Sequence, residues 1–379
     1  METPVVLLLM GLSLWALGSD RAIAIGVFVG LTVLCRIDGG IWAAVMILAL
    51  GLKSPRKAAI SALAAFAVVL PWIVFATLYF GSFLPNSMLA KAVVRPGREG
   101  ILLDGEHILK YALWYVKGTG FVASMYLYPL WVAVLSLGAY RLLRQNARDL
   151  WPVVAFPFVY AFTMYAGRCP RFEWYLVPIT YACMMLLGVG MMEVYRGVKR
   201  LIPARAQALV AASIVTAAVL WYCGAAVPTM IRHMCPRAAI EDYVRTEVGK
   251  WLRDNTPEHA SVAMEAIGYQ GYYSQRRIID FAGLVTPKVV EFKRSTAKNG
   301  QVFDDVLRFF EPDYIVLRSY EVDTNHHFNG GLLFATPEKE RQFRETYREV
   351  RRFDAPGSGP KDLLCHLTVY QRIVVSGFR

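Results

Sequence analysis

Long apolar runs alternate with short polar junctions over residues 1–227. The first three runs are shorter than the ~20 residues that a straight membrane span needs, so we expect their helices to continue through the polar junctions. The repetition predicts a polytopic α-helical membrane domain, residues 1–228, with about eight transmembrane helices. The apolar runs lie at residues 5–17, 22–35, 41–52, 58–79, 119–139, 150–166, 174–195 and 207–227.

The pattern changes from residue 229, where short amphipathic and β-like segments alternate. Residues 239–254 would place Val244, Val248, Trp251 and Leu252 on one face of a helix. The alternation of helices with strands indicates an α/β domain over residues 229–379. The sequence predicts further helices at 302–310 and 338–352, strands at 261–265, 277–281, 314–317 and 364–373, and a Gly/Tyr turn at 268–273.

Charge is divided unevenly between these two parts. Residues 1–227 carry a net charge of +10, whereas residues 228–379 carry +2. Ten Lys and Arg fall in three short junctions that the order of the spans places on one side of the membrane, which identifies that side as cytoplasmic. The C-terminal domain is therefore predicted to be extracytoplasmic. No basic stripe or nucleic-acid module occurs in it, so we expect no nucleic-acid partner. The ten residues are Lys53, Arg56, Lys57, Arg141, Arg144, Arg148, Arg196, Lys199, Arg200 and Arg205.

The six cysteines stand singly, without the Cys-x-x-Cys spacing of zinc sites and redox motifs. Cys169 and Cys235 each precede a proline in segments predicted to lie outside the membrane. A disulfide between them stays open, because spacing alone does not fix the geometry of a bridge. His326, His327 and the other four histidines lack ligand spacing. We therefore expect neither a metal site nor a cofactor.

A turn-rich segment, Phe80–Ala92, follows the fourth apolar run. Gly81, Pro85 and Asn86 break regular structure, and a short helix carrying Lys91 can restart after Asn86. A polar turn between two spans faces water unless protein covers it. The segment is therefore either an ordinary loop with an N-capped helix or part of a binding site.

Two further polar motifs are predicted at the outer ends of apolar runs. Arg36-Ile37-Asp38-Gly39 separates the second and third runs, and its charges read either as topology markers or as functional residues at the membrane boundary. Arg171 stands shortly before Trp174 and Tyr175 at the start of a late run. These aromatics read either as interfacial anchors or as residues that face a ligand. Arginine suits bidentate contact with phosphate, where a lysine acts as a compact point charge.

Taken in order, these motifs resemble those of bacterial GT-C glycosyltransferases, integral membrane enzymes that take a sugar from a polyprenyl-phosphate carrier. Residues 84–91 resemble the family's Leu-Pro-Asn-x-x-x-x-Lys, and residues 171–178 resemble its Arg-x-x-Trp-Tyr-x-x-Pro. Residues 35–39 resemble Thr-Arg-Pro-Asp/Glu-Gly, with Cys35 and Ile37 as departures. Residues 268–284 resemble a Gly-x-x-x-Tyr-Tyr…Asp-x-x-Gly-Leu run of its extracytoplasmic domain, although they also suit turn and strand scaffolding. The likeness is to arabinofuranosyl- and mannosyltransferases of this class.

The first residues, Met1-Glu2-Thr3-Pro4, resemble a Gly-Met-Glu-Thr-x-Leu junction that follows several spans in this family. The resemblance implies a catalytic aspartate in the first extracytoplasmic loop, for which residues 1–379 hold no counterpart. We therefore expect about three spans to precede Met1 in the complete enzyme, and the chain as written to lack part of the catalytic machinery. The alternative is a genuine eight-span protein that starts at Met1.

The resemblance implies an inverting, integral-membrane glycosyltransferase of the bacterial cytoplasmic (inner) membrane. It would move a sugar from a polyprenyl-phosphate donor to a glycan or lipid acceptor of the cell envelope on the outer face, among membrane lipids. That chemistry needs cations for the leaving phosphate and a carboxylate base for the acceptor hydroxyl. A transporter or flippase of lipid-linked sugars and a non-catalytic membrane scaffold are the alternatives. The candidate catalytic residues are Glu2 and Asp38, and the candidate substrate-binding residues are Arg36, Asn86, Lys91, Arg171, Trp174 and Tyr175.

Overall fold

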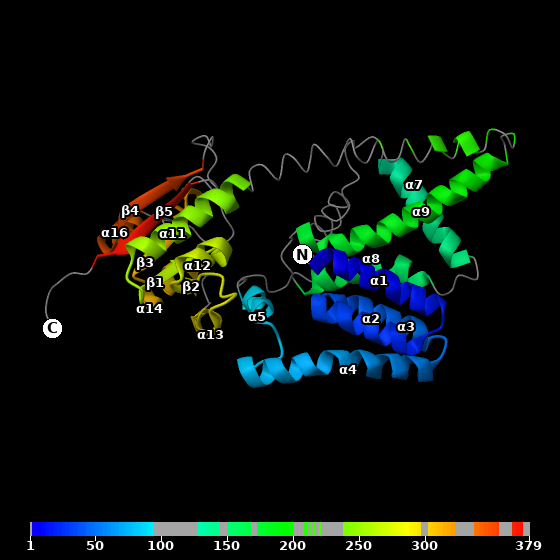
Figure 1. The fold of residues 1–379 in the computed structure, drawn as a ribbon, viewed down its shortest axis with the longest axis horizontal. Helices are drawn as coiled ribbons and strands as arrows, with labels where there is room; N and C mark the ends of the chain where they lie inside the picture. Colours follow the sequence, from blue (N-terminus) through cyan, green and yellow to red (C-terminus); the bar gives the residue numbers. More distant parts are fainter. Residues whose placement is uncertain are drawn as a thin grey trace. The chain divides into compact units, whose positions relative to one another are not determined.

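The computed structural model describes residues 2–93, 128–144, 150–167, 173–200, 238–296, 302–322, 337–355 and 366–373, with scattered positions between 203 and 220. The chain forms two compact units, and Figure 1 shows their helices and strands coloured along the sequence. The first comprises Met1–Phe83 and Gly100–Ala226, and the second comprises Leu84–Glu99 and Val227–Arg379. The turn-rich segment Phe80–Ala92 is therefore divided: it belongs to the helical unit up to Phe83 and to the α/β unit from Leu84 onward.

Helices cover the apolar runs of the first unit wherever the structure describes them. Ser54 caps the fourth of these helices by accepting a hydrogen bond from the Lys57 amide at 3.4 Å, and Pro55 occupies its first turn. Gly81 ends the same helix at φ +73°, a left-handed conformation that favours glycine. The helices are α1 (Glu2–Gly18), α2 (Ala22–Cys35), α3 (Gly39–Gly51), α4 (Pro55–Phe80), α7 (Tyr128–Arg144), α8 (Trp151–Ala166), the 3₁₀ turn η3 (Glu173–Tyr175) and α9 (Val177–Lys199).

By length and composition, α4 and α9 are each long and apolar enough to cross a membrane, while α1, α2, α3 and α8 are apolar but shorter. Helix α4 exposes a run of large apolar side chains, with Leu63 69% and Leu78 83% exposed. Such an exposed apolar surface is unusual in a helix that faces water. The eighth predicted span lies largely outside the described residues, and the number of spans stays a prediction.

The core of the helical unit is built around Trp42 of α3. The indole ring packs edge-on against Phe156 of α8 at 4.9 Å between ring centroids, and its Nε1 donates to Ser13 Oγ of α1 at 2.9 Å. Trp42 is 2% exposed and Phe156 is 1% exposed. This contact fixes α1, α3 and α8 against one another.

The second unit holds a five-stranded sheet of strand order β2-β1-β3-β5-β4. Strands β2, β1 and β3 run parallel, whereas β5 lies antiparallel to both β3 and β4. The chain moves from β1 to β2 on one side and then returns to place β3 on the other, as in doubly wound α/β folds. The strands are β1 (Ser261–Met264), β2 (Arg277–Asp280), β3 (Tyr314–Arg318), β4 (Tyr347–Asp354) and β5 (His366–Arg372).

Helices cover both faces of this sheet (Figure 1), because alternate residues of each strand point to opposite sides. Ile315 and Leu317 of β3 belong to one apolar cluster, while Tyr314 and Val316 belong to the other. The first cluster includes side chains of α13, α14 and α16, and the second includes side chains of η4 and α11. The helices of this unit are α5 (Asn86–Val93), the π-helical η4 (Ala238–Arg245), α11 (Thr246–Asn255), α12 (Ile267–Ser274), α13 (Pro287–Thr296), α14 (Val302–Phe310), α15 (Ser319–Val322) and α16 (Pro337–Thr346).

Two local predictions for this unit are wrong. Residues 268–273 form most of helix α12 rather than a turn, because Gln270 and Ser274, one helical turn apart, are both buried against the rest of the unit. The predicted helix at 338–352 ends with α16 at Thr346, and the chain continues as β4. Charged side chains on that segment suit an edge strand, where they discourage pairing with other chains.

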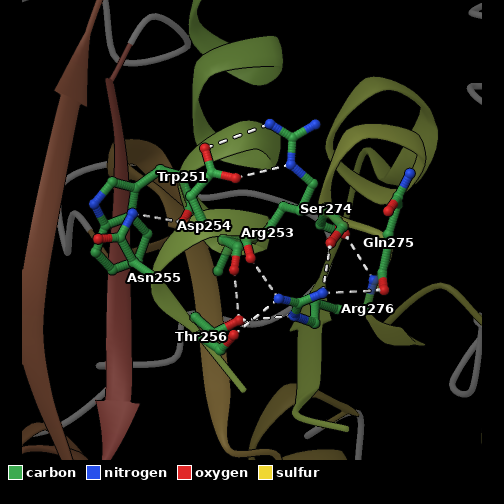
Figure 2. Close-up of polar contacts among 9 residues, drawn as sticks. Trp251, Arg253, Asp254, Asn255, Thr256, Ser274, Gln275 and Arg276 are labelled. Atoms are coloured by element: carbon green, nitrogen blue, oxygen red, sulfur yellow. Dashed lines mark hydrogen bonds and ion pairs between the residues drawn. The ribbon is translucent and has the colours of Figure 1, made fainter. Parts of the chain in front are cut away.

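Arg276 joins the ends of α11 and α12 (Figure 2). Its Nε donates to Thr256 Oγ1 at 3.0 Å, and one terminal nitrogen donates to the carbonyls of Arg253 at 2.5 Å and Thr256 at 2.8 Å. The other terminal nitrogen donates to the carbonyls of Ser274 and Gln275, both at 3.4 Å. The last carbonyls of a helix lack partners within the helix, so a guanidinium placed here stabilises both helix ends.

We expect Arg276→Ala to lower the local unfolding free energy of α11 and α12 by about 2 kcal/mol, because hydrogen bonds from a charged group are lost. Hydrogen-exchange mass spectrometry of the full chain measures this as faster exchange in residues 246–256 and 267–274. Arg277→Ala is the matched control, because the adjacent Arg277 is exposed at the start of β2. Equal exchange in both variants would contradict the assignment.

Candidate functional site

The junction between α2 and α3 forms a tight polar corner in the first unit. Arg36 ends α2 in an extended conformation, at φ −152° and ψ 130°, and Asp38 precedes the first turn of α3. Gly39 lies so close to α2 that a Cβ atom would come within 2.6 Å of the Thr32 carbonyl oxygen. Glycine therefore permits the close turn that brings Arg36 and Asp38 side by side.

Arg36 and Asp38 make a two-fold ion pair. Nε of Arg36 donates to Oδ1 of Asp38 at 3.0 Å, and a terminal nitrogen donates to Oδ2 at 2.9 Å. The two side chains are only 10% and 7% exposed. Bidentate geometry and low exposure make this pair strong and fix the orientation of the guanidinium.

Two tyrosines from distant segments complete the cluster. The Tyr160 hydroxyl of α8 donates to Oδ2 of Asp38 at 2.5 Å, and Tyr160 is fully buried. The Arg36 guanidinium lies 5.8 Å from the ring centroid of Tyr175 in η3, within the range of a cation–π contact. Trp174, next to Tyr175, is 46% exposed, and its ring lies 6.1 Å from the Tyr175 ring. We call Arg36, Asp38, Tyr160 and Tyr175 the junction cluster.

The junction cluster presents a fixed cation beside aromatic rings. Guanidinium groups suit phosphate and carboxylate ligands, and here Asp38 already occupies Nε and one terminal nitrogen of Arg36. An exposed tryptophan suits the apolar face of a sugar or a lipid chain. Asp38 already accepts three hydrogen bonds, from two nitrogens of Arg36 and from Tyr160. Its observed contacts therefore favour a positioning role over proton transfer. Within the described residues, no group of three or more His, Cys, Asp and Glu side chains could hold a metal ion.

The other sequence-predicted site residues divide into two sets. Glu2 begins α1 and Lys91 lies in α5, but their side chains are outside the described part of the structure, as are Arg171 and the two cysteines Cys169 and Cys235. Asn86 begins α5 in the second unit, so its convergence with Arg36 stays a prediction.

Tyr160 was not predicted as a site residue. It lies inside an apolar run, where a tyrosine reads as a core side chain. The available signal is its hydroxyl, because a phenol buried in an apolar segment needs a hydrogen-bond partner.

Asn86 contacts the loop that follows β2. Its Nδ2 donates to the carbonyls of Gly283 at 2.5 Å and Leu284 at 3.1 Å. The same loop is held from inside by Asp280, which is 1% exposed and accepts hydrogen bonds from the amides of Ala282 at 2.9 Å and Val285 at 3.1 Å. Two motifs almost 200 residues apart thus form one packed structure, in which the observed role of Asn86 is structural.

We expect Asn86→Ala to lower the local stability of α5 and of the 280–285 loop by about 1–2 kcal/mol, because two hydrogen bonds from one partly buried amide group are lost. Faster hydrogen exchange in residues 86–93 and 281–289 would report it. Met88→Ala, a change of a half-exposed residue two positions further along α5, serves as the control. If the variant exchanges normally but binds the polyprenyl-phosphate sugar more weakly, Asn86 would instead be a substrate-binding residue.

Lys293 of α13 is buried beneath this loop. It is 4% exposed, and its Nζ donates to the Phe281 carbonyl. Burial lowers the pKa of Lys293 to about 8, against a smaller opposing effect of the Asp280 carboxylate. The unfolded chain, with a lysine pKa near 10.4, then binds more protons than the folded chain between about pH 8 and pH 10.

The free energy of unfolding should therefore rise with pH across this window, by about 2 kcal/mol between pH 7.5 and pH 9.5. The reason is that the unfolded state binds more protons than the folded state, so raising the pH disfavours the unfolded state. Urea unfolding of the wild type and of Lys293→Met at both pH values measures the difference. The variant should lack this rise. A wild-type curve that parallels the variant would show that Lys293 is not buried as described.

Comparison with known proteins finds a family match for one part of the chain. Residues 237–371, which include all of the five-stranded sheet except Arg372 at the end of β5, match the model of a family described as a domain of unknown function (DUF8728). No curated protein matches the chain. The family match thus covers most of the α/β unit and does not include the junction cluster of the helical unit.

Proposed function

We propose that the chain is an integral-membrane glycosyltransferase that moves a sugar from a polyprenyl-phosphate donor to a glycan or lipid acceptor on the outer face of the cytoplasmic membrane. The observation that carries the proposal is the junction cluster. Arg36 and Asp38 belong to one predicted motif and Tyr175 to another, more than a hundred residues later, and the two motifs meet around one guanidinium. The exposed apolar side chains of α4 support a location in lipid.

In the proposed reaction, the acceptor hydroxyl attacks the anomeric carbon of the donor sugar. A new bond forms between that carbon and the acceptor oxygen, while the bond to the phosphate oxygen breaks and the phosphate leaves with the electron pair. Arg36 stabilises the charge that develops on the phosphate. Asp38 and Tyr160 hold Arg36 in place, Trp174 and Tyr175 border the sugar, and a carboxylate other than Asp38 takes the acceptor proton.

Reconstitution into proteoliposomes tests the proposal. The donors are polyprenyl phosphates linked to radiolabelled arabinofuranose or mannose, and both donor binding and transfer to added cell-envelope glycan or lipid are measured. The chain is assayed as encoded and with any in-frame upstream sequence restored. Donor binding by both forms, with transfer by at least the extended form, is expected.

Two outcomes would replace the proposal by an alternative. Movement of the labelled carrier across the vesicle bilayer without a new glycosidic bond would identify a transporter. If neither form binds the donor, the remaining alternative is a non-catalytic membrane scaffold.

A further inference from the structure

Helices α7 and α9 cross at unusually close range. A Cβ atom at Gly138 of α7 would lie 2.0 Å from the carbonyl oxygen of Leu186, and one at Gly190 of α9 would lie 2.1 Å from that of Val134. Only glycine allows backbones to touch in this way, as in the small-residue crossings of membrane helices. Figure 1 shows α7 and α9 crossing, and Arg141 and Glu193, each three residues after one of these glycines, form an ion pair at 2.9 Å.

A cavity of about 330 Å³ opens about one turn beyond this crossing. Its lining combines the side chains of Leu137, Tyr140, Arg141 and Arg144 from α7 with Glu193 from α9. The cavity therefore has an apolar wall, a phenol and two guanidinium groups, with one carboxylate.

Positive charge exceeds negative charge around the cavity. Glu193 is shared, because it pairs with Arg141 at 2.9 Å and also with Arg196. Arg144 lies over the ring of Tyr140 at 5.5 Å, and none of the carboxylates in the described residues pairs with it. Cations in the last turn of a helix complement the helix dipole, and that accounts for their presence on α7 and α9. It does not account for a cavity between them.

Exposed apolar side chains neighbour the lining residues in sequence on both helices. Leu143 is 60% exposed on α7, and Met192 and Val194 are 50% and 42% exposed on α9. A soluble anion would leave these side chains in water, whereas a lipid would cover them with its acyl chains. The three arginines also fall in junctions that the charge pattern places on the cytoplasmic side, where anionic lipids concentrate.

We propose that this cavity binds the phosphate headgroup of an anionic phospholipid, with Arg141 and Arg144 as its ligands and the exposed apolar side chains of α7 and α9 in contact with lipid acyl chains. The inference rests on the membrane location in the proposed function, but not on the transfer reaction. It concerns the opposite side of the bilayer from the one proposed for the carrier.

Native mass spectrometry of the full chain in detergent micelles, titrated with phosphatidylglycerol or phosphatidylcholine, tests this site. The double variant Arg141→Gln/Arg144→Gln should weaken phosphatidylglycerol binding roughly 30-fold, and Arg144→Gln alone about 5-fold, from the contribution of each cation to anionic lipid binding. Phosphatidylcholine binding should change little. Arg56→Gln is the matched control, because Arg56 is exposed on α4, on the same predicted side, and away from the cavity.

The outcomes separate this inference from its competitors. Equal loss in Arg56→Gln and in the double variant would overturn the site in favour of diffuse charge attraction. Displacement of the lipid by millimolar inorganic phosphate would show that the ligand is a soluble anion. Release of the chain from membranes by alkaline carbonate would contradict its membrane location. If the chain binds the lipid selectively but transfers no sugar, only the enzymatic proposal is contradicted.

Discussion

Arg36→Gln is expected to reduce sugar transfer by about 10²–10³-fold, the usual effect of removing one donor that faces developing charge. The physical reason is that glutamine occupies a similar volume but carries no charge for the leaving phosphate. Donor binding should weaken as well, because in the proposed site the same guanidinium also contacts the phosphate before the reaction. Transfer and binding in proteoliposomes, at equal amounts of inserted protein, give the two values.

Two companion variants make this result specific. Arg36→Lys keeps the charge but loses the planar fork that pairs with Asp38, so intermediate activity is expected. Arg21→Gln removes the same charge at the α1–α2 junction, where Arg21 lies over the Trp15 ring, and should leave transfer unchanged. Equal losses in Arg36→Gln and Arg21→Gln would show that the effect is not a property of the junction cluster.

Asp38→Ala is expected to cost about 3–5 kcal/mol of folding stability, because it leaves a largely buried guanidinium without its carboxylate. It also removes the acceptor of the Tyr160 hydroxyl, which is fully buried. Unfolding of the purified chain in mixed micelles of increasing denaturing detergent measures the loss.

Tyr160→Phe isolates one part of this effect and should cost about 1 kcal/mol, the net value of a single hydrogen bond. In the double variant Arg36→Met/Asp38→Leu both charges are replaced by apolar groups, which should restore most of the stability lost in Asp38→Ala. Such a variant would be stable yet inactive in transfer. Strong destabilisation by the double variant would mean that packing, rather than the unpaired charge, dominates the effect of Asp38→Ala.

The periodicity of the sequence predicted elements whose residues face one side only. Helix α14 lies where the pattern placed it, at residues 302–310, because its apolar residues recur at helical spacing. Strand β3, which begins at residue 314 as expected, is instead a short continuous apolar run that is buried on both faces. The region 338–352 carries so many charges on both faces that neither period stands out, and β4 there is specified by its pairing with β5. Strand pairing is a tertiary contact that local composition does not encode.

The candidate site was predictable to a similar degree. Arg36, Asp38 and Tyr175 stand out because ionisable and amphipathic residues at a membrane boundary are functional candidates, and because they belong to motifs that resemble those of one enzyme family. Tyr160 does not stand out, since its role depends on a hydrogen bond to Asp38, just before α3, and the spacing of residues in α8 does not reveal that contact. The contact of Asn86 with Gly283 and Leu284 is hidden for the same reason, because a separation of almost 200 residues leaves no periodic signal.

The central claim is that the junction cluster holds the phosphate of a lipid-linked sugar. Photo-crosslinking with a polyprenyl-phosphate sugar that carries a photoreactive group next to the phosphate tests it most directly, with labelled peptides identified by mass spectrometry. Labelling of the peptides that contain residues 36–40 and 173–176, lost in Arg36→Gln and kept in Arg21→Gln, is the predicted result. Labelling confined to other segments, such as the C-terminal ends of α7 and α9, would contradict the claim.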